Sequence, residues 1–165
     1  MAEVLVLDYH NLLRKRVANG NVPGQPTATN MQKMVWDDAL AEKAQKWADK
    51  SLDSHNPDRS DPKNRWPTGE NLYGQYSAAP LSGQFNWKLA IDKWFNEYED
   101  FSFNKKTIFQ IIWHNSMYVG CGATYDKGSR YSTTYICNYG PGLVHFKFPY
   151  DVFFFLLTPP NFREY

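Results

Sequence analysis

Residues 117–139, MYVGCGATYDKGSRYSTTYICNY, contain the pattern that decides the fold class. Residues alternate along 117–125 and again along 130–139, as expected for two half-buried β-strands. The four residues between these segments, Asp126-Lys127-Gly128-Ser129, favour a turn. The stretch therefore predicts an antiparallel β-hairpin.

The two cysteines of the chain, Cys121 and Cys137, lie on opposite sides of this predicted turn. Facing residues of a hairpin come close enough for one disulfide bond, so we expect a Cys121–Cys137 bridge. The alternative is a pair of free buried thiols, because a bridge requires an oxidising compartment. Neither a Cys-x-x-Cys motif nor a Cys/His zinc spacing is present.

Outside the hairpin, the spacing of apolar residues predicts four helices. The first covers about residues 5–17, with Arg14 facing outward, and the second follows Asp37, a candidate N-cap. The third covers residues 87–98, and the fourth, apolar on every side, is expected as a buried helix over residues 108–113. Helices that accompany a hairpin favour an α+β fold, with helices covering an antiparallel sheet.

Length, composition and charge exclude several classes of protein. The 165 residues suit one domain, and their 17% aromatic content suits a dense core. A net charge of +1 provides no electrostatic footprint for nucleic acid or for anionic lipid. The longest apolar run, residues 152–157, is far shorter than a membrane span. Residues 1–8 have no basic segment and too short an apolar run for a signal peptide.

Catalytic motifs are absent, but three side chains are candidates for a site. No zinc-protease, serine-hydrolase, P-loop or Rossmann motif occurs in the sequence. His55 could act as a ligand or a base, although a turn histidine bonded to the backbone is the simpler interpretation. Glu70 enters an apolar segment, where a carboxylate either faces solvent or has a partner. Glu97 lies on the aromatic third helix, where a solvated carboxylate is the simpler interpretation.

Seven short motifs, each weak alone, occur in an order that is highly specific. They are Tyr9-His10-Asn11-x-x-Arg14, His55-Asn56-Pro57, Gly69-Glu70-Asn71-Leu72, Trp94-Phe95-Asn96-Glu97, Gln110-Ile111-Ile112-Trp113, Val119-Gly120-Cys121-Gly122 and Cys137-Asn138-Tyr139-Gly140-Pro141-Gly142. Together they resemble the CAP superfamily of cysteine-rich secretory proteins, antigen 5 allergens and plant pathogenesis-related proteins of group 1. The sequence of residues 7–50 is most similar to the arthropod venom-allergen branch of this superfamily.

The resemblance implies a three-layer α-β-α sandwich with a central antiparallel sheet. It also implies a cleft of two histidines and two glutamates that binds a divalent metal in some members. His55, Glu70 and Glu97 fall on three of these positions, whereas Thr107 stands where the second histidine is expected. A hydroxyl is a poor substitute for imidazole as a zinc ligand, so we expect no cofactor and no specific zinc binding.

The resemblance also implies a secreted, monomeric and mostly non-enzymatic protein that binds a lipid, a sterol or a protein receptor. One alternative is a metal-dependent hydrolase that uses His55, Glu70 and Glu97. Another is a fragment or pseudogene product with a decayed site. We assign residues 1–142 to the CAP domain, whereas the Phe-rich residues 143–165 match nothing that we recognise. Together with the missing signal peptide, this tail indicates an incomplete or misjoined gene model, or a divergent intracellular member.

Overall fold

The computed structural model describes residues 2–25, 27–77, 84–100, 110–127 and 131–142. Helices and strands in these ranges follow one another in an α+β order. They are α1 (Ala2–Ala18), β1 (Val35–Trp36), α2 (Asp38–Ala48), β2 (Gly69–Ser77), α3 (Trp87–Asn96), the 3-10 turns η1 (Glu97–Asp100) and η2 (Gln110–Ile112), β3 (Tyr118–Asp126) and β4 (Tyr131–Gly140).

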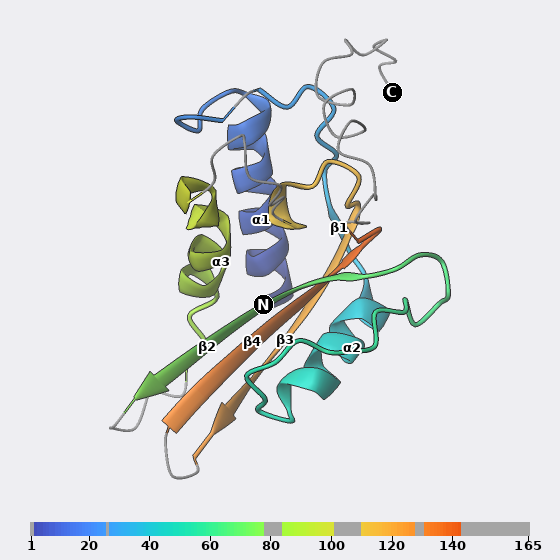
Figure 1. Cartoon of the computed structure of the whole chain (residues 1–165), viewed down its shortest axis with the longest axis vertical. Coiled ribbons are helices and arrows are strands. Elements are labelled where there is room, and N and C mark those ends of the chain that lie inside the picture. Colours follow the sequence, from blue (N-terminus) through green and yellow to red (C-terminus); the bar gives the residue numbers. More distant parts are fainter. Residues whose placement is uncertain (1, 26, 78–83, 101–109, 128–130, 143–165) are drawn as a thin grey trace.

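The strands form one sheet in the order β1-β3-β4-β2, which lies between two helical layers. Helices α1 and α3 cover one face and α2 covers the other (Figure 1). This arrangement confirms the predicted α-β-α sandwich. The sheet is mixed rather than wholly antiparallel, because β1 pairs with β3 in parallel through two residues, whereas β4 is antiparallel to both β3 and β2.

The predicted hairpin is formed by β3 and β4, and the predicted disulfide joins them. Cys121 lies directly opposite Cys137 in the register, with their Cα atoms 4.1 Å apart. Both side chains are buried on the α1/α3 face of the sheet. In the chain-entropy model, closing a loop of this size stabilises the fold by about 3 kcal/mol.

Two glycines of β3 let α2 lie directly on the other face of the hairpin. A Cβ atom on Gly120 would come within 2.2 Å of the Ala41 backbone nitrogen, and one on Gly122 within 2.4 Å of the Gln45 Cα. The Gln45 side-chain amide then donates to the Ala123 carbonyl over 3.0 Å and accepts from the Ala123 N–H over 3.1 Å. These contacts satisfy the β3 backbone where no strand pairs with it.

The apolar residues whose spacing predicted the second and third helices are buried in α2 and α3. Asp37 caps α2, and its carboxylate accepts from the Ala39 and Leu40 N–H groups over 3.0 and 3.1 Å. The apolar face of α3 enters the main core, where its buried side chains are Trp87, Ala90, Ile91, Trp94 and Phe95.

The outward orientation predicted for Arg14 is wrong. Arg14 is only 1% exposed and lies inside the α1 face that packs on the rest of the domain. Its guanidinium donates over 2.8–3.3 Å to the backbone oxygens of Gln32, Ile111, Trp113, His114 and Ser116. Burial lowers the pKa of Arg14 to about 10, which still leaves the group charged at neutral pH. The charge is tolerated because every guanidinium N–H direction meets a carbonyl dipole.

The buried helix predicted over residues 108–113 is also wrong where the structure describes it. Residues 110–112 form a single 3-10 turn, and residues 108 and 109 lie outside the described ranges. The carbonyls of Ile111 and Trp113 accept from Arg14. Of the apolar residues in this segment that the structure describes, Ile111 and Trp113 are buried as predicted, whereas Ile112 is half-buried.

A second buried polar group, His10, joins α1 to β4. Its Nδ1 donates to the Val6 carbonyl over 2.7 Å, so its Nε2 accepts from the Tyr139 hydroxyl over 3.0 Å. Asn71 of β2 donates to the same hydroxyl over 3.1 Å. Because a carbonyl can only accept, these contacts fix His10 as the neutral Nδ1–H tautomer.

We expect the Arg14→Met variant to lose about 3 kcal/mol or more of folding free energy, because five buried carbonyls lose their donor. Urea unfolding followed by far-UV circular dichroism measures the loss. The matched control is Lys15→Met on the exposed side of α1, which should change the free energy by less than about 0.5 kcal/mol. Equal effects of both substitutions would contradict the assigned role of Arg14.

We expect folding stability to fall as the pH drops from about 6.5 to about 4. Burial is the main cause that lowers the pKa of His10 to about 4, while unfolded histidine titrates near pH 6.5. Between these values the unfolded chain binds a proton that the folded chain does not, which costs up to about 3 kcal/mol. Urea unfolding at several pH values should show this slope in the wild type and in Tyr139→Phe, which keeps the histidine. A wild-type-like slope in His10→Gln would refute the assignment to His10.

Candidate functional site

Two of the predicted site residues, His55 and Glu70, are in direct contact. His55 lies in the loop that follows α2, and Glu70 is the second residue of β2. His55 Nδ1 lies 2.8 Å from Glu70 Oε1. The Glu70 side chain is only 1% exposed, whereas that of His55 is 55% exposed. The pair therefore joins a buried carboxylate to an imidazole at the surface.

Glu70 is surrounded by donors from two parts of the fold, the loop after α2 and β4. Besides His55, the Asn56 backbone N–H donates to Oε1 over 2.9 Å, and the Arg59 guanidinium forms an ion pair with it at 3.8 Å. Asn138 of β4 lies opposite Glu70 in the register. With its amide oriented to satisfy both groups, Asn138 donates to Glu70 Oε2 over 3.3 Å and accepts from the Ala44 N–H over 3.2 Å. Both carboxylate oxygens are thus engaged by the protein.

This arrangement determines what His55 can offer to a ligand. A carboxylate that accepts from Nδ1 holds the imidazole in one orientation and directs Nε2 away from the carboxylate. Nε2 can then accept a hydrogen bond or a proton, or serve as one ligand of a metal ion. Glu70 orients the ring, and its engaged oxygens are poorly placed for coordination.

Glu97 lies elsewhere in the sandwich. It caps the C-terminus of α3, opens η1 and is exposed. Burial is the largest cause that raises the pKa of the Tyr139 hydroxyl, and the negative charge of Glu97 raises this pKa further. Tyr139 belongs to the α1/α3 face of the sheet, whereas Glu70 meets the α2 face through Asn138 and Ala44. The fourth predicted position, Thr107, lies outside the described residues.

In the ranges that the structure describes, no three histidine, cysteine, aspartate or glutamate side chains gather closely enough to hold a metal ion. His55 and Glu70 contact each other, but two side chains do not make such a group. The expectation that the chain binds no zinc specifically therefore stays a prediction.

Sequence reasoning missed two residues that complete the Glu70 environment, Arg59 and Asn138. Asn138 belongs to one of the seven motifs, but its contact with Glu70 depends on the strand register, in which the two residues face each other. Arg59 lies in a loop whose path no periodicity predicts. Its carbonyl is held by the Thr68 N–H over 2.7 Å, next to the start of β2.

The comparisons with known proteins agree with the fold and with the motif order. The Cysteine-rich secretory protein family (CAP) matches residues 7–139. A protein described as CRISP/Allergen/PR-1 from Trittame loki is 35% identical over 156 residues, which cover 84% of this chain but only 38% of that protein. Scoloptoxin SSD43 from Scolopendra dehaani is 32% identical over 150 residues, covering 82% of this chain and 67% of the toxin.

A solved structure supports the same assignment. Venom allergen-like protein 4 of Schistosoma mansoni superposes with a TM-score of 0.65 at 28% identity, covering 86% of this chain and 89% of that one. The overall fold of the chain is thus shared with this solved structure. The chain belongs to the cysteine-rich secretory protein (CAP) family and is similar to its venom allergen-like members.

Proposed function

We propose that this chain is an extracellular, non-enzymatic binding protein of the venom allergen-like type. The observation that carries the proposal is the environment of Glu70, whose two oxygens accept from His55, Asn56 and Asn138 and form an ion pair with Arg59. Hydrolysis requires a nucleophile, or a metal-bound water together with a free base. A carboxylate that four protein groups engage serves instead to hold the loop and the sheet together.

A metal-dependent hydrolase is the second candidate, and one observation favours it. His55 is exposed, and its ring is held by a buried carboxylate, as in many metal sites. A tight zinc site nevertheless needs at least three well-placed ligands. Thr107 in place of the second family histidine removes one imidazole, which is why we rank this candidate below a binding protein.

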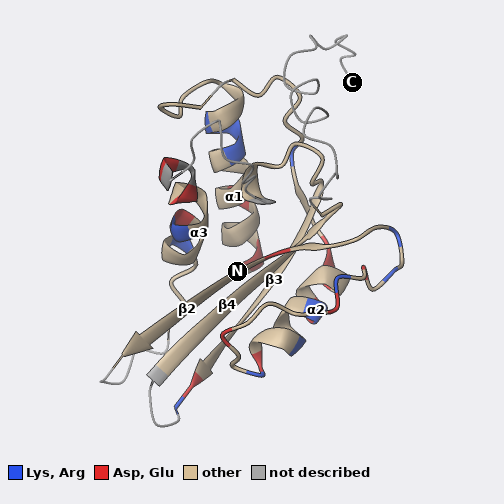
Figure 2. Cartoon of the chain, viewed as in Figure 1, with Lys and Arg blue, Asp and Glu red and all other residues tan. Residues whose placement is uncertain are grey.

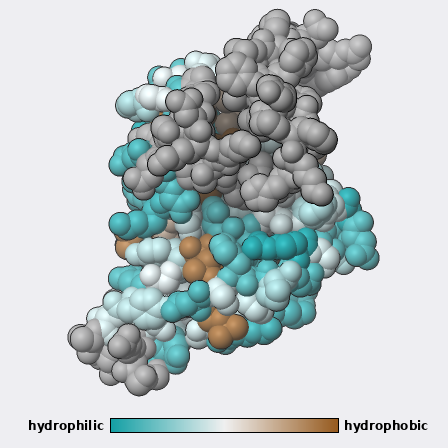
Figure 3. Space-filling model, viewed as in Figure 1, coloured by the Kyte–Doolittle hydropathy of each residue, from teal (hydrophilic) through white to brown (hydrophobic). Residues whose placement is uncertain are grey.

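The surface favours a protein ligand over a lipid or sterol. On the face shown in Figure 3, apolar residues form small patches separated by hydrophilic ones. The most exposed large apolar side chains of the described residues are spread over several elements, including Leu12 of α1, Val35 of β1 and Tyr76 of β2. A lipid would require a continuous apolar surface or cavity. None of the helices in the described ranges has the length and apolar character to cross a bilayer.

Extracellular placement is supported by the disulfide and by the family. A buried Cys121–Cys137 bridge forms and persists in oxidising compartments. The matching family is described as secretory, and one relative is named a toxin. We therefore infer that the protein acts outside the cell.

The proposal predicts that zinc binds more weakly than about 1 µM near neutral pH, because one imidazole cannot form a tight site. Isothermal titration of the full chain with zinc chloride measures this affinity. Zinc should also produce no cleavage of a fluorogenic peptide substrate. The Thr107→His variant restores the family histidine and should bind zinc more tightly if residue 107 faces the cleft.

The opposite result would be stoichiometric, submicromolar zinc binding by the unmodified protein that His55→Ala abolishes. Together with zinc-dependent peptide cleavage, that result would replace the binding protein with the metal-dependent hydrolase.

A further inference from the structure

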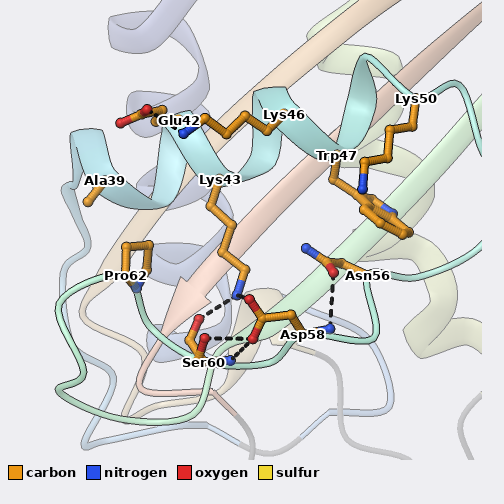
Figure 4. A pocket seen from close by; sticks show the side chains of 10 residues that line it. All are labelled: Ala39, Glu42, Lys43, Lys46, Trp47, Lys50, Asn56, Asp58, Ser60 and Pro62. Atoms are coloured by element: carbon orange, nitrogen blue, oxygen red, sulfur yellow. Dashed lines mark hydrogen bonds and ion pairs between the residues drawn. The ribbon is translucent and has the colours of Figure 1, made fainter.

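A groove of about 390 Å³ lies between α2 and the loop that follows it (Figure 4). Its walls include Lys43, Lys46 and Trp47 from the helix, and Lys50, Asn56 and Asp58 from the segment that follows it. This volume is within the range of sites that bind small molecules or single side chains of a partner. The groove adjoins the His55–Glu70 pair, because Asn56 directly follows His55.

The charges of the groove leave an excess of one positive charge. Its lining contains three lysines, balanced in part by Glu42 and Asp58. Side-chain and backbone hydrogen bonds from Ser60 lower the pKa of Asp58 to about 2, so this carboxylate remains ionised. Figure 2 shows charged residues of both signs along α2 and the neighbouring loop. A ligand with a single negative charge would neutralise the groove.

The floor of the groove is held in place by a buried ammonium group. The Lys43 side chain is 8% exposed, forms an ion pair with Asp58 at 3.4 Å and donates to the Ser60 carbonyl. Because a buried ammonium is costly unless it is paired, these bonds fix the loop against α2. The groove is therefore formed before a ligand arrives.

Two donors border the open space above this floor. The Lys50 ammonium lies 4.4 Å from the centre of the Trp47 ring, a cation–π contact that restricts the lysine. The Trp47 indole N–H donates to the Ser54 carbonyl over 2.8 Å, which fixes the ring itself. Lys46 has only an exposed ion pair with Glu42, at 2.6 Å, and such pairs rearrange at little cost.

The opposite wall presents Asn56 Nδ2, an amide nitrogen that has no hydrogen-bond acceptor among the residues that the structure describes. Asn56 is nine-tenths buried; its backbone N–H donates to Glu70, and its Oδ1 accepts from the Asp58 N–H over 3.0 Å. These two bonds fix the side chain and leave Nδ2 directed into the groove (Figure 4). An amide nitrogen that reaches an open groove can donate its N–H groups to an acceptor on a ligand in place of water.

We propose that this groove binds a carboxylate group, supplied by an acidic side chain of a protein partner. The carboxylate would accept from Asn56 Nδ2 on one side and from the Lys50 ammonium group on the other. A carboxylate matches the single excess charge, and its two oxygens match donors on two walls. The proposal deepens the proposed binding function by naming the ligand chemistry, and it rests on that function only for the source of the carboxylate.

The test is a titration of the uniformly ¹⁵N-labelled full chain with sodium acetate, at an ionic strength held constant with sodium chloride. The reporters are the Asn56 side-chain amide and Trp47 indole signals in ¹H–¹⁵N spectra. We expect both signals to shift and saturate. Lys50→Gln should weaken acetate binding by about tenfold, as expected for the loss of a charge-assisted hydrogen bond.

The Asn56→Asp variant keeps the acceptor that binds the Asp58 N–H but replaces the free donor with a negative oxygen, so it should abolish the saturation. The matched control is Lys88→Gln, which removes an exposed, i,i+4-paired lysine of α3 on the other side of the sheet and should leave binding unchanged. Shifts that never saturate, or equal affinities in all three variants, would overturn the proposal. Saturation by sodium sulfate but not by acetate would overturn the carboxylate assignment. The titration uses acetate and no protein partner. A negative result would therefore reject the carboxylate site but not the proposed binding function.

Discussion

The fold depends on one buried positive charge, the Arg14 guanidinium, and on the backbone carbonyls that surround it. A charge at this depth is tolerated only if its hydrogen-bonding directions are filled, and the segment around residues 111–116 supplies most of the acceptors. That segment leads directly into β3, so α1 and the hairpin are fixed relative to each other. Asn11, one turn earlier, does the same for β1 by exchanging two hydrogen bonds with the Met34 backbone.

The same logic governs the candidate site. Glu70 is a buried negative charge whose donors come from the loop after α2 and from β4. The acceptors of Arg14 likewise come from two separate stretches of backbone, Gln32 and residues 111–116. Motif residues such as Asn11, Arg14 and Glu70 thus form hydrogen bonds that join elements distant in sequence.

Sequence patterns predicted the structure correctly where the environment of a residue is set by its neighbours in sequence. Alternation around the turn predicted the hairpin and its disulfide, Asp37 predicted the start of α2, and the apolar spacing of residues 87–95 predicted the buried face of α3. The errors arose where distant partners decide. Periodicity placed Arg14 outside, because its five acceptors are nearly all about a hundred residues away. The contact of His55 with Glu70 followed only from the family resemblance, since its geometry depends on a loop and on the strand register.

Asn56 connects the two surface features of the α2 side. Its backbone N–H belongs to the Glu70 cluster that orients His55, while its side chain caps the Asp58 N–H and faces the groove. A ligand that contacted Asn56 Nδ2 would therefore be one residue from His55 and joined to it through the same carboxylate. Because Glu70 is buried and bonded to both the loop and β4, the two sites cannot move independently. His55 thus lies next to Asn56 at the edge of the groove and is held by the same carboxylate that the Asn56 backbone contacts.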